Sequence, residues 1–383
     1  MQQHNNKICF ATGEFFPTVG GLSKSATRIA KMLASSGFEM HVVVPIQGTI
    51  SKLKIVPEKM DKLFVYQIPV GDDILNSNGI SLINEIRKLD KDINFDLFHG
   101  FFLPMAYACC LAMGNNHRPL ISSIRGSDAK KWSVPAMKNL LKLVLKKTNC
   151  LTSVNNRLLS KLLIASEVNL DTMFIKNSIE LNSKEKWNID KATSGKIGTL
   201  GKFQKSKEIN VLLDSYKNIN NNIKSNLTLI GDFPSKELKL ENKNKIEALQ
   251  LQEELTLSGF LNEKEVIKNL IDLNVFVSTS SSEGFPNALL EAAFLGLPIV
   301  VAAFEGIEDY CEDGKNVLMV PVGDIKATSD AISSILTNKE LARKLSKGAM
   351  KLAKSLAPEK EKQQWVRLYK NLLGNNSQTN FLK

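Results

Sequence analysis

The feature that most constrains the fold is an alternation of short apolar runs with longer amphipathic segments. Lys7–Ala11 and Met40–Pro45 have the continuous apolar character of buried strands, and Ser23–Ser36 between them has helical spacing of its apolar residues. The same alternation restarts at Gly195–Leu200 and continues through Pro298–Ala302. Buried strands separated by helices are typical of parallel sheets covered on both faces. The sequence therefore predicts an α/β protein with two Rossmann-like, doubly wound units.

The length of 383 residues agrees with two units, because a domain usually has about 100–200 residues. A polar stretch rich in Lys, Asn, Asp and Ser separates the two series of strands and is predicted to be a linker. The predicted boundaries are residues 1–180 for the first domain, 181–195 for the linker and 196–356 for the second domain. Ligands of such folds bind outside the carboxyl ends of the strands. We therefore expect two facing domains with the chemistry in a cleft between them.

The segment Ser278–Pro298 (STSSSEGFPNALLEAAFLGLP) carries the strongest functional signal. A strand is predicted to end at Ser278. A polar loop with Glu283 follows it and leads into a helix that contains Glu291. The loop and helix can hold two parts of one ligand, and the free N–H groups at a helix N-terminus favour an anion such as phosphate. Two solvated acids near a helix start would be the ordinary alternative. Gly284 and Pro286 favour a ligand site, because they permit close backbone approach and stiffen the turn.

The sequence EGFPNALLEA, with its Glu-x7-Glu spacing, resembles the signature of family 4 glycosyltransferases, which have the GT-B fold. Four other segments resemble the family in order along the chain. These are Pro17–Ser23 (PTVGGLS), Phe174–Glu180 (FIKNSIE), Gly231–Pro234 (GDFP) and Glu305–Tyr310, which is followed by Asp313-Gly314. The resemblance covers nearly the whole chain. It implies a retaining glycosyltransferase whose donor is a nucleotide-diphosphate sugar.

The resemblance also implies roles for individual residues. Glu291 would hold the ribose hydroxyls and Glu283 the hydroxyls of the donor sugar, while the backbone of Gly284, Phe285, Pro286 and Asn287 would line the sugar and diphosphate. Lys202 and Lys207 would neutralise the diphosphate, with Lys202 standing where the family usually has arginine and Glu208 where it usually has glycine. A solvated loop of lysines is the alternative for this segment. The backbone amides of Gly20 and Gly21 would add to the phosphate site.

Transfer requires cations and amides around the leaving phosphate, where negative charge builds up. The family is described as using front-face displacement, in which the leaving phosphate takes the acceptor proton, so we assign no protein nucleophile. The resemblance also implies independence of metal ions, so we assign no metal ion and no cofactor. His99 resembles a position near the donor sugar and is predicted as a catalytic group, although a lone histidine at a strand end is as often structural. Arg125 and Asp128 either bind substrate or pair with each other. In the family the last helix, 357–373 here, crosses back to the N-terminal domain.

The net charge of +11 indicates an anionic partner. Residues 118–161 hold ten basic residues and one acid, and within them Val134–Lys147 is predicted to be an amphipathic helix. An anionic membrane surface fits better than nucleic acid, because no nucleic-acid motif is present. A helix packed on its own sheet with solvated lysines is the alternative. Without a secretory pattern or a long apolar segment, and with five cysteines in no metal or disulfide pattern, we expect a cytoplasmic protein, peripheral at the inner face of the plasma membrane if the basic segment binds lipid.

The predicted function is transfer of a sugar from a nucleotide-diphosphate sugar to a hydroxyl of a glycan or lipid-linked acceptor. Assembly of cell-surface polysaccharide or lipopolysaccharide is the usual setting for relatives of this architecture. Two alternatives remain open at this point: a non-catalytic protein that binds nucleotide sugars, and a nucleotide-sugar epimerase. The lysine pair and the spacing of EGFPNALLEA count against the epimerase.

Overall fold

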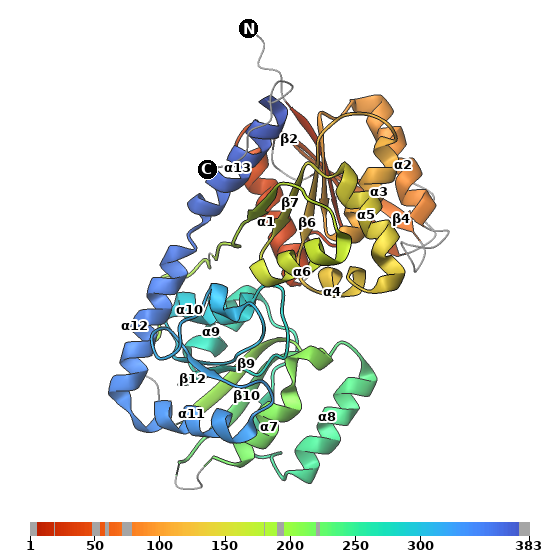
Figure 1. Ribbon diagram of the computed structural model, residues 1–383. Coiled ribbons are helices and arrows are strands. Elements are labelled where there is room, and N and C mark those ends of the chain that lie inside the picture. The colour runs from red at the N-terminus through yellow and green to blue at the C-terminus, as the bar shows by residue number, and fades with distance from the viewer. Residues whose placement is uncertain are drawn as a thin grey trace. The chain divides into compact units, whose positions relative to one another are not determined.

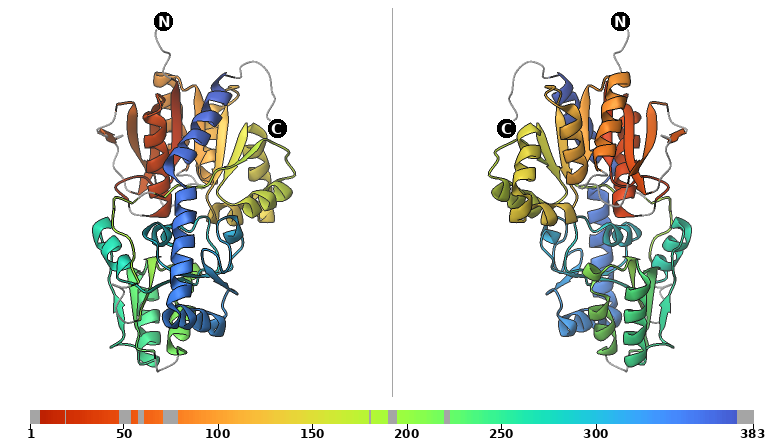
Figure 2. Two further views of the ribbon diagram at one scale, coloured as in Figure 1. Left: turned by 90° about the vertical axis from the view of Figure 1, so that its left-hand side faces the viewer. Right: turned by 90° about the vertical axis from the view of Figure 1, so that its right-hand side faces the viewer.

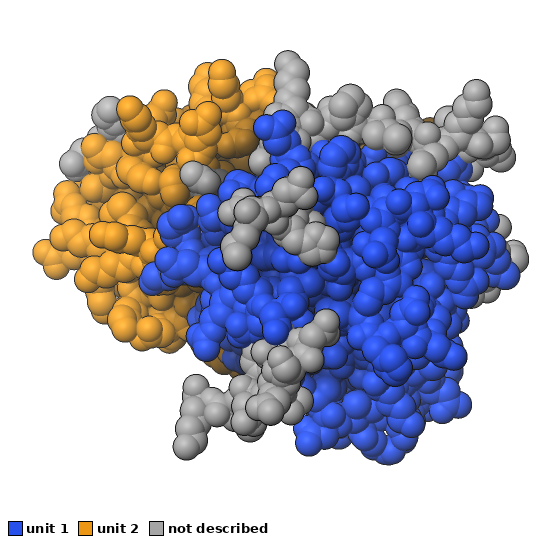
Figure 3. All heavy atoms as spheres, turned by 90° about the horizontal axis from the view of Figure 1, so that it is seen from above, with its two compact units in different colours: residues 1–177, 359–383 blue, residues 178–358 orange. Residues whose placement is uncertain are grey.

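The computed structural model describes residues 6–18, 20–47, 54–57, 61–70, 79–179, 181–189, 195–219 and 223–374, with only the backbone given for 54–57 and without the side chains of Ser127 and Lys130. The chain divides into two compact units, one of residues 1–177 with 359–383 and the other of residues 178–358 (Figure 3). The predicted linker begins inside the second unit, and its residues 190–194, like the predicted boundary residue Glu180, lie outside the described part of the chain.

The first unit, unit 1, contains an eight-stranded sheet in the order β3-β4-β2-β1-β5-β6-β7-β8 (Figure 1). All neighbouring strands are parallel except β3 and β4. Its elements are β1 (Lys7–Thr12), α1 (Gly21–Ala34), β2 (Glu39–Gln47), β3 (Lys54–Pro57), β4 (Leu63–Val70), α2 (Gly79–Ile93), β5 (Leu97–Phe101), α3 (Leu103–Met113), β6 (Leu120–Ile124), α4 (Ser127–Trp132), the 3-10 helix η1 (Pro135–Met137), α5 (Lys138–Lys147), β7 (Cys150–Ser153), α6 (Asn156–Ser166), β8 (Thr172–Phe174) and α13 (Pro358–Gly374).

The second unit, unit 2, contains a six-stranded, wholly parallel sheet in the order β11-β10-β9-β12-β13-β14. Its elements are β9 (Lys196–Lys202), the 3-10 helix η2 (Lys205–Lys207), α7 (Ile209–Lys217), β10 (Asn226–Asp232), α8 (Lys236–Ala248), β11 (Leu255–Leu257), α9 (Glu263–Ile271), β12 (Val275–Ser278), α10 (Asn287–Leu295), β13 (Ile299–Ala302), the 3-10 helix η3 (Ile307–Asp309), β14 (Leu318–Val320), α11 (Ile325–Thr337) and α12 (Lys339–Ser355). The prediction of two doubly wound α/β units is confirmed.

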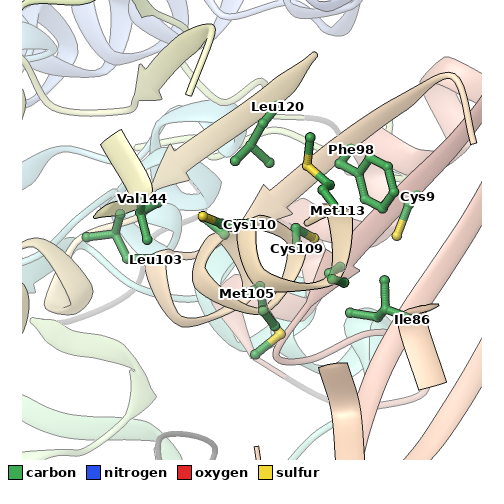
Figure 4. Close-up of a cluster of buried hydrophobic side chains, with 14 of the residues drawn as sticks. Cys9, Ile86, Phe98, Leu103, Met105, Cys109, Cys110, Met113, Leu120 and Val144 are labelled. Atoms are coloured by element: carbon green, nitrogen blue, oxygen red, sulfur yellow. The ribbon is translucent and has the colours of Figure 1, made fainter. Parts of the chain in front are cut away.

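Helices cover both faces of the unit 1 sheet, as the continuous apolar strands require (Figure 2). On one face, α2, α3, α5 and α6 bury their apolar residues against the strands. Figure 4 shows part of this core, in which Cys109 and Cys110 of α3 lie near Phe98 and Leu120 of the strands. All five cysteines of the chain are free and buried, and burial raises the pKa of the Cys150 thiol to about 12.

The other face of the unit 1 sheet is covered by α1 and by the last helix, α13. Trp365 and Tyr369 of α13 are fully buried and lie in one apolar cluster with Phe10 of β1. Arg28 of α1 forms an ion pair with Glu361 of α13 at 2.9 Å, and the glutamate is 2% exposed. Apolar burial and this paired charge thus fix a helix from the end of the sequence onto the first sheet.

Candidate functional site

The candidate site of unit 2 is built on the carboxyl ends of adjacent parallel strands. Lys202 ends β9 and pairs in register with Asp232 at the end of β10, while Ser278 ends β12. Because these strands are parallel, the loops that follow them leave the sheet at the same edge. The loops 203–208 and 279–286 therefore start side by side.

Backbone and hydroxyl hydrogen bonds join these two loops. The N–H of Ser281 donates to the carbonyl of Ser206 at 2.9 Å. The hydroxyl of Thr279 lies 3.0 Å from the carbonyl oxygen of Lys207 and 3.1 Å from that of Glu208, to which it donates. The loops are thus held together before any ligand binds, and the side chains that they carry are brought to fixed positions.

The joined loops place Lys207 and Glu283 in direct contact. The Nζ atom of Lys207 lies 2.8 Å from Oε1 of Glu283, and the side chains are 23% and 13% exposed. Ser280 donates its hydroxyl to the same carboxylate oxygen at 2.6 Å. Two residues that the resemblance assigned to donor binding therefore form one half-buried, paired group. Lys202 lies exposed at the end of β9, on the strand that leads into the Lys207 loop.

The segment from Gly284 to Asn287 connects the loop to α10. Phe285 is 8% exposed and packs edge-on against Tyr310 at 5.2 Å between ring centroids. Pro286 precedes the helix and Asn287 is its first residue. Glu291 lies further along α10 and is 4% exposed. The structure thus does not show Glu291 as a solvated acid, which was the ordinary alternative.

Close backbone approach between β9 and β10 explains a glycine pair beneath the site. A Cβ atom on Gly231, whose φ is +131°, would lie 1.9 Å from the carbonyl oxygen of Gly201. No side chain fits there, so both strands keep the spacing that positions Lys202. Beyond them, the ring of Phe233 packs at a tilt against that of Phe203, with 5.3 Å between the ring centroids. Phe233 fills a buried position beside Phe203.

In unit 1 the predicted substrate-binding residues lie at the carboxyl edge of the sheet. Gly20 directly precedes α1 and has extended backbone, and Gly21 is the first residue of that helix. The guanidinium of Arg125, just after β6, lies 4.3 Å from the centroid of the Phe101 ring and donates to the side-chain carbonyl of Asn177. These contacts hold the arginine flat at the strand ends. Sequence reasoning missed Asn177, although it lies within the segment 174–180 quoted for the resemblance.

Asp128 is buried, and its carboxylate is bound by backbone N–H groups. It is fully buried and accepts hydrogen bonds from the backbone N–H groups of Leu103, Arg125 and Gly126 at 2.9–3.1 Å. Burial raises the pKa of this carboxyl, while the backbone donors act in the opposite direction. The contact with Arg125 at 3.0 Å is with its backbone N–H. A carboxylate so enclosed fixes the turn after β6.

The prediction of His99 as a catalytic group is corrected by its burial. The ring is 0% exposed, and its Nδ1 lies 2.6 Å from the Tyr369 hydroxyl while its Nε2 lies 2.6 Å from the Ser123 hydroxyl. It packs edge-on against Phe10 at 4.9 Å. Burial, followed by the charge of Arg125, lowers the pKa of His99 well below its usual value, so the ring is neutral. Both nitrogens are engaged inside the core, and His99 has a packing role.

The described residues contain no cluster of three or more His, Cys, Asp or Glu side chains suited to hold a metal ion. Nor does any helix in the described part of the chain have the length and apolar composition needed to cross a bilayer. The predicted amphipathic helix Val134–Lys147 is shorter than expected, because Pro135 opens the 3-10 turn η1 and α5 begins only at Lys138.

Two family models match the chain. Residues 182–352 match "Glycosyl transferases group 1" and residues 19–165 match "Glycosyltransferase Family 4". A curated relative, N-acetyl-alpha-D-glucosaminyl L-malate synthase of Bacillus anthracis, is 22% identical over 94% of this chain and 96% of its own length. The lipopolysaccharide core biosynthesis glycosyltransferase LpsE of Rhizobium meliloti is 37% identical over 20% of this chain and 22% of its own length.

Solved structures agree on the fold. The sucrose-phosphate synthase of Thermosynechococcus elongatus superposes with a TM-score of 0.84 at 17% identity, covering 97% of this chain and all of that one. Anabaena HepE, solved in complex with UDP-glucose, superposes with a TM-score of 0.77 at 16% identity, covering 95% of this chain and 99% of that one. These glycosyltransferase neighbours and the two doubly wound sheets establish the GT-B fold for this chain.

Proposed function

The chain belongs to glycosyltransferase family 4, and from this premise we propose that it transfers a sugar from a nucleotide-diphosphate donor to a hydroxyl acceptor with retention of anomeric configuration. The observation that carries the proposal is the Lys207–Glu283 pair, held between two joined loops at the carboxyl edge of the unit 2 sheet. Parallel α/β sheets bind ligands at this edge.

The lysines supply the electrostatic part of the mechanism. As the bond from the anomeric carbon to the diphosphate breaks, negative charge develops on the leaving phosphate, and fixed cations lower the barrier. Lys207 is already oriented by Glu283, and Lys202 lies at the end of the adjoining strand. Because Lys202 replaces the usual arginine, it gives a point charge rather than a planar two-point contact. We propose that the leaving phosphate takes the acceptor proton, so that no protein nucleophile is needed.

The acidic residues then hold the neutral parts of the donor. Glu283 is proposed to contact the sugar hydroxyls and Glu291 the ribose hydroxyls, with the backbone of 284–287 lining the diphosphate. The contacts of Glu283 fit this role, because Lys207 and Ser280 both bind its carboxylate and hold it in a polar environment. In unit 1, the N–H groups of Gly20 and Gly21 and the side chain of Arg125 are proposed to bind substrate. Asp128 acts by shaping the turn that carries Arg125.

The test compares Lys207→Ala with Lys205→Ala, an exposed lysine of the same 3-10 helix that makes no ion pair among the described residues. We expect Lys207→Ala to reduce the transfer rate at least 100-fold more than Lys205→Ala does, since removing one preorganised charge contact at a transition state lowers the rate by about that factor. Equal activity of both variants would refute the site. Glu283→Ala should also abolish transfer, and retained donor binding without any transfer by the wild type would indicate a binding protein.

The donor and acceptor are proposed from the relatives. Anabaena HepE was solved with UDP-glucose, so we propose a UDP-sugar donor for this chain. The name of LpsE supports a glycan or lipid-linked acceptor in polysaccharide or lipopolysaccharide assembly, whereas the Bacillus relative is named for a small hydroxy acid, malate. A thermal-shift comparison of UDP, GDP and ADP tests the donor, because a ligand stabilises the folded state that binds it. Transfer that persists in EDTA is expected, as the proposal involves no metal ion.

Peripheral association with an anionic membrane through residues 118–161 is a second proposal. It is supported by exposed Lys131 and Lys146 and by Leu143, which is 39% exposed. The available charge is smaller than the sequence indicated, because Lys138 and Lys142 both pair with Glu167. Salt-sensitive binding to anionic vesicles that is weakened by Lys131→Gln with Lys146→Gln is the expected result. Binding that ignores both the lipid charge and these substitutions would contradict it.

A further inference from the structure

The outer face of α12 carries a row of positive charge that the proposed transfer reaction does not use. Six cations of this helix are exposed, namely Lys339, Arg343, Lys344, Lys347, Lys351 and Lys354. At 3.6 residues per turn, they occupy about 140° of the helix circumference. Glu340 is the one acid on the same face.

The packing of α12 fixes the direction of this face. Its buried residues, including Leu345 and Ala349, lie on the opposite side and pack in unit 2, with α10, α11 and β13 as neighbours (Figure 1). Gly348 lets α12 lie directly against the backbone at Lys315, because a Cβ atom on residue 348 would lie 1.9 Å from the carbonyl oxygen of Lys315. The helix therefore cannot rotate to hide its lysines, and the row stays directed to solvent.

The lysines of the row lack acidic partners within the described part of the chain. None of the five forms an ion pair there, in contrast to Lys138 and Lys142 of α5, which share Glu167. Like charges spaced four residues apart, such as Lys347 and Lys351, destabilise an isolated helix. Among the described residues, the row thus keeps five unpaired lysine charges on one face, to which an anionic surface is complementary.

We propose that the α12 row is a docking surface for an anionic lipid bilayer. The helix has 17 residues and, at 1.5 Å per residue, presents its cations along about 25 Å of straight surface. Five of the six are lysines, whose compact charge suits a diffuse surface potential, whereas arginine suits two-point recognition of a single phosphate or carboxylate. Met350 is 37% exposed among them, so the row also carries one partly exposed apolar side chain.

The experiment measures co-sedimentation of the full chain with vesicles of phosphatidylcholine alone or with added phosphatidylglycerol. The test variant combines Lys347→Gln, Lys351→Gln and Lys354→Gln. Its matched control removes the same charge from other exposed lysines of unit 2, at Lys236, Lys264 and Lys268. Circular dichroism of both variants verifies that they are folded.

The test variant should bind anionic vesicles about 100-fold more weakly at low salt, since each lysine near an acidic surface changes the affinity about fivefold. The control variant should lose only a few-fold in affinity for these vesicles, which is the effect of the lower net charge alone. An equal loss in both variants, or equal binding to the neutral vesicles, would overturn the proposal. Tight binding of RNA or an acidic protein, without vesicle binding, would also overturn it. Both variants keep the lysines of residues 118–161, so a difference between the two variants tests the α12 row and not the membrane proposal for that segment.

Discussion

The backbone at Glu208 offers a direct test of how the lysine loop is built. Glu208 lies between η2 and α7 with φ of 49° and ψ of 47°, in the left-handed region. The resemblance to the family places a glycine at this position, and the structure gives the physical reason for that preference. A residue with a Cβ atom is strained in this conformation, whereas glycine is not.

The size of the effect follows from two opposing contributions. A side chain in the left-handed conformation costs about 1–2 kcal/mol. Glycine has greater freedom in the unfolded chain, which removes about 0.5–1 kcal/mol of the gain. No described ion pair or side-chain hydrogen bond of the Glu208 carboxylate would be lost. Glu208→Gly should therefore stabilise unit 2 by about 0.5–1 kcal/mol, or a Tm increase of about 1–4 °C for a unit of this size.

Scanning calorimetry of the full chain measures this change, with Glu208→Ala as the matched control. Alanine also removes the carboxylate but keeps the Cβ atom, so its Tm should stay near that of the wild type. The backbone contacts of the position remain in both variants, including the Thr279 hydroxyl bond to its carbonyl. A gain of equal size in both variants would show that the carboxylate, not the backbone, is responsible. A lower Tm for the glycine variant would refute the strain itself.

Three further predictions concern other parts of the molecule. Gly231→Ala places a Cβ atom 1.9 Å from the Gly201 carbonyl oxygen, so it should lower the Tm by well over 5 °C and abolish donor-induced thermal shifts. Tyr369→Phe leaves a buried nitrogen of His99 without its hydroxyl partner and should cost about 1–3 kcal/mol in denaturant unfolding. Lys138 and Lys142 lower the pKa of Glu167 from 4.5 to about 2. The contribution of these ion pairs to folding stability is therefore complete above the ordinary pKa of the carboxyl and is lost as the pH falls toward 2. Replacing both lysines with methionine should return the pKa of Glu167, measured by NMR, toward 4.5.

Much of the fold followed from local sequence patterns. The continuous apolar runs predicted strands such as β1, β2 and β12, because such runs are buried on both faces of a parallel sheet. The stretch between residues 46 and 95 gave no comparable signal. There β4 runs through Pro69 and ends beside α2, and β3 pairs antiparallel at the sheet edge. Edge strands are short and irregular, so their patterns are weak. The polar segment 237–249 lies largely in the helix α8, which has a Ser235 cap.

The site was predicted where its residues are close in sequence, and less well where the partner is distant. The loop, turn and helix from Glu283 to Glu291 are contiguous, so a motif could locate them. His99 could not be classified in this way, because its partner Tyr369 is 270 residues further along the chain. Burial by a C-terminal helix turns a histidine at a strand end into a core residue. The Lys207–Glu283 contact is similarly a product of neighbouring parallel strands, with no signal in either segment alone.

The distribution of ion pairs changes how the net charge of +11 should be interpreted. In the strongest cluster of the sequence, residues 118–161, at least three of the ten cations form ion pairs with acids outside the segment: Arg118 pairs with Asp90, and two lysines of α5 share one glutamate. The lysines of α12 form no such pairs in the described structure, although the sequence there also contains an acid. A surface attracts anions through the cations that remain unpaired, and a sequence count cannot separate these from paired ones. The α12 lysines are therefore a second source of positive potential in addition to residues 118–161, which hold most of the excess charge.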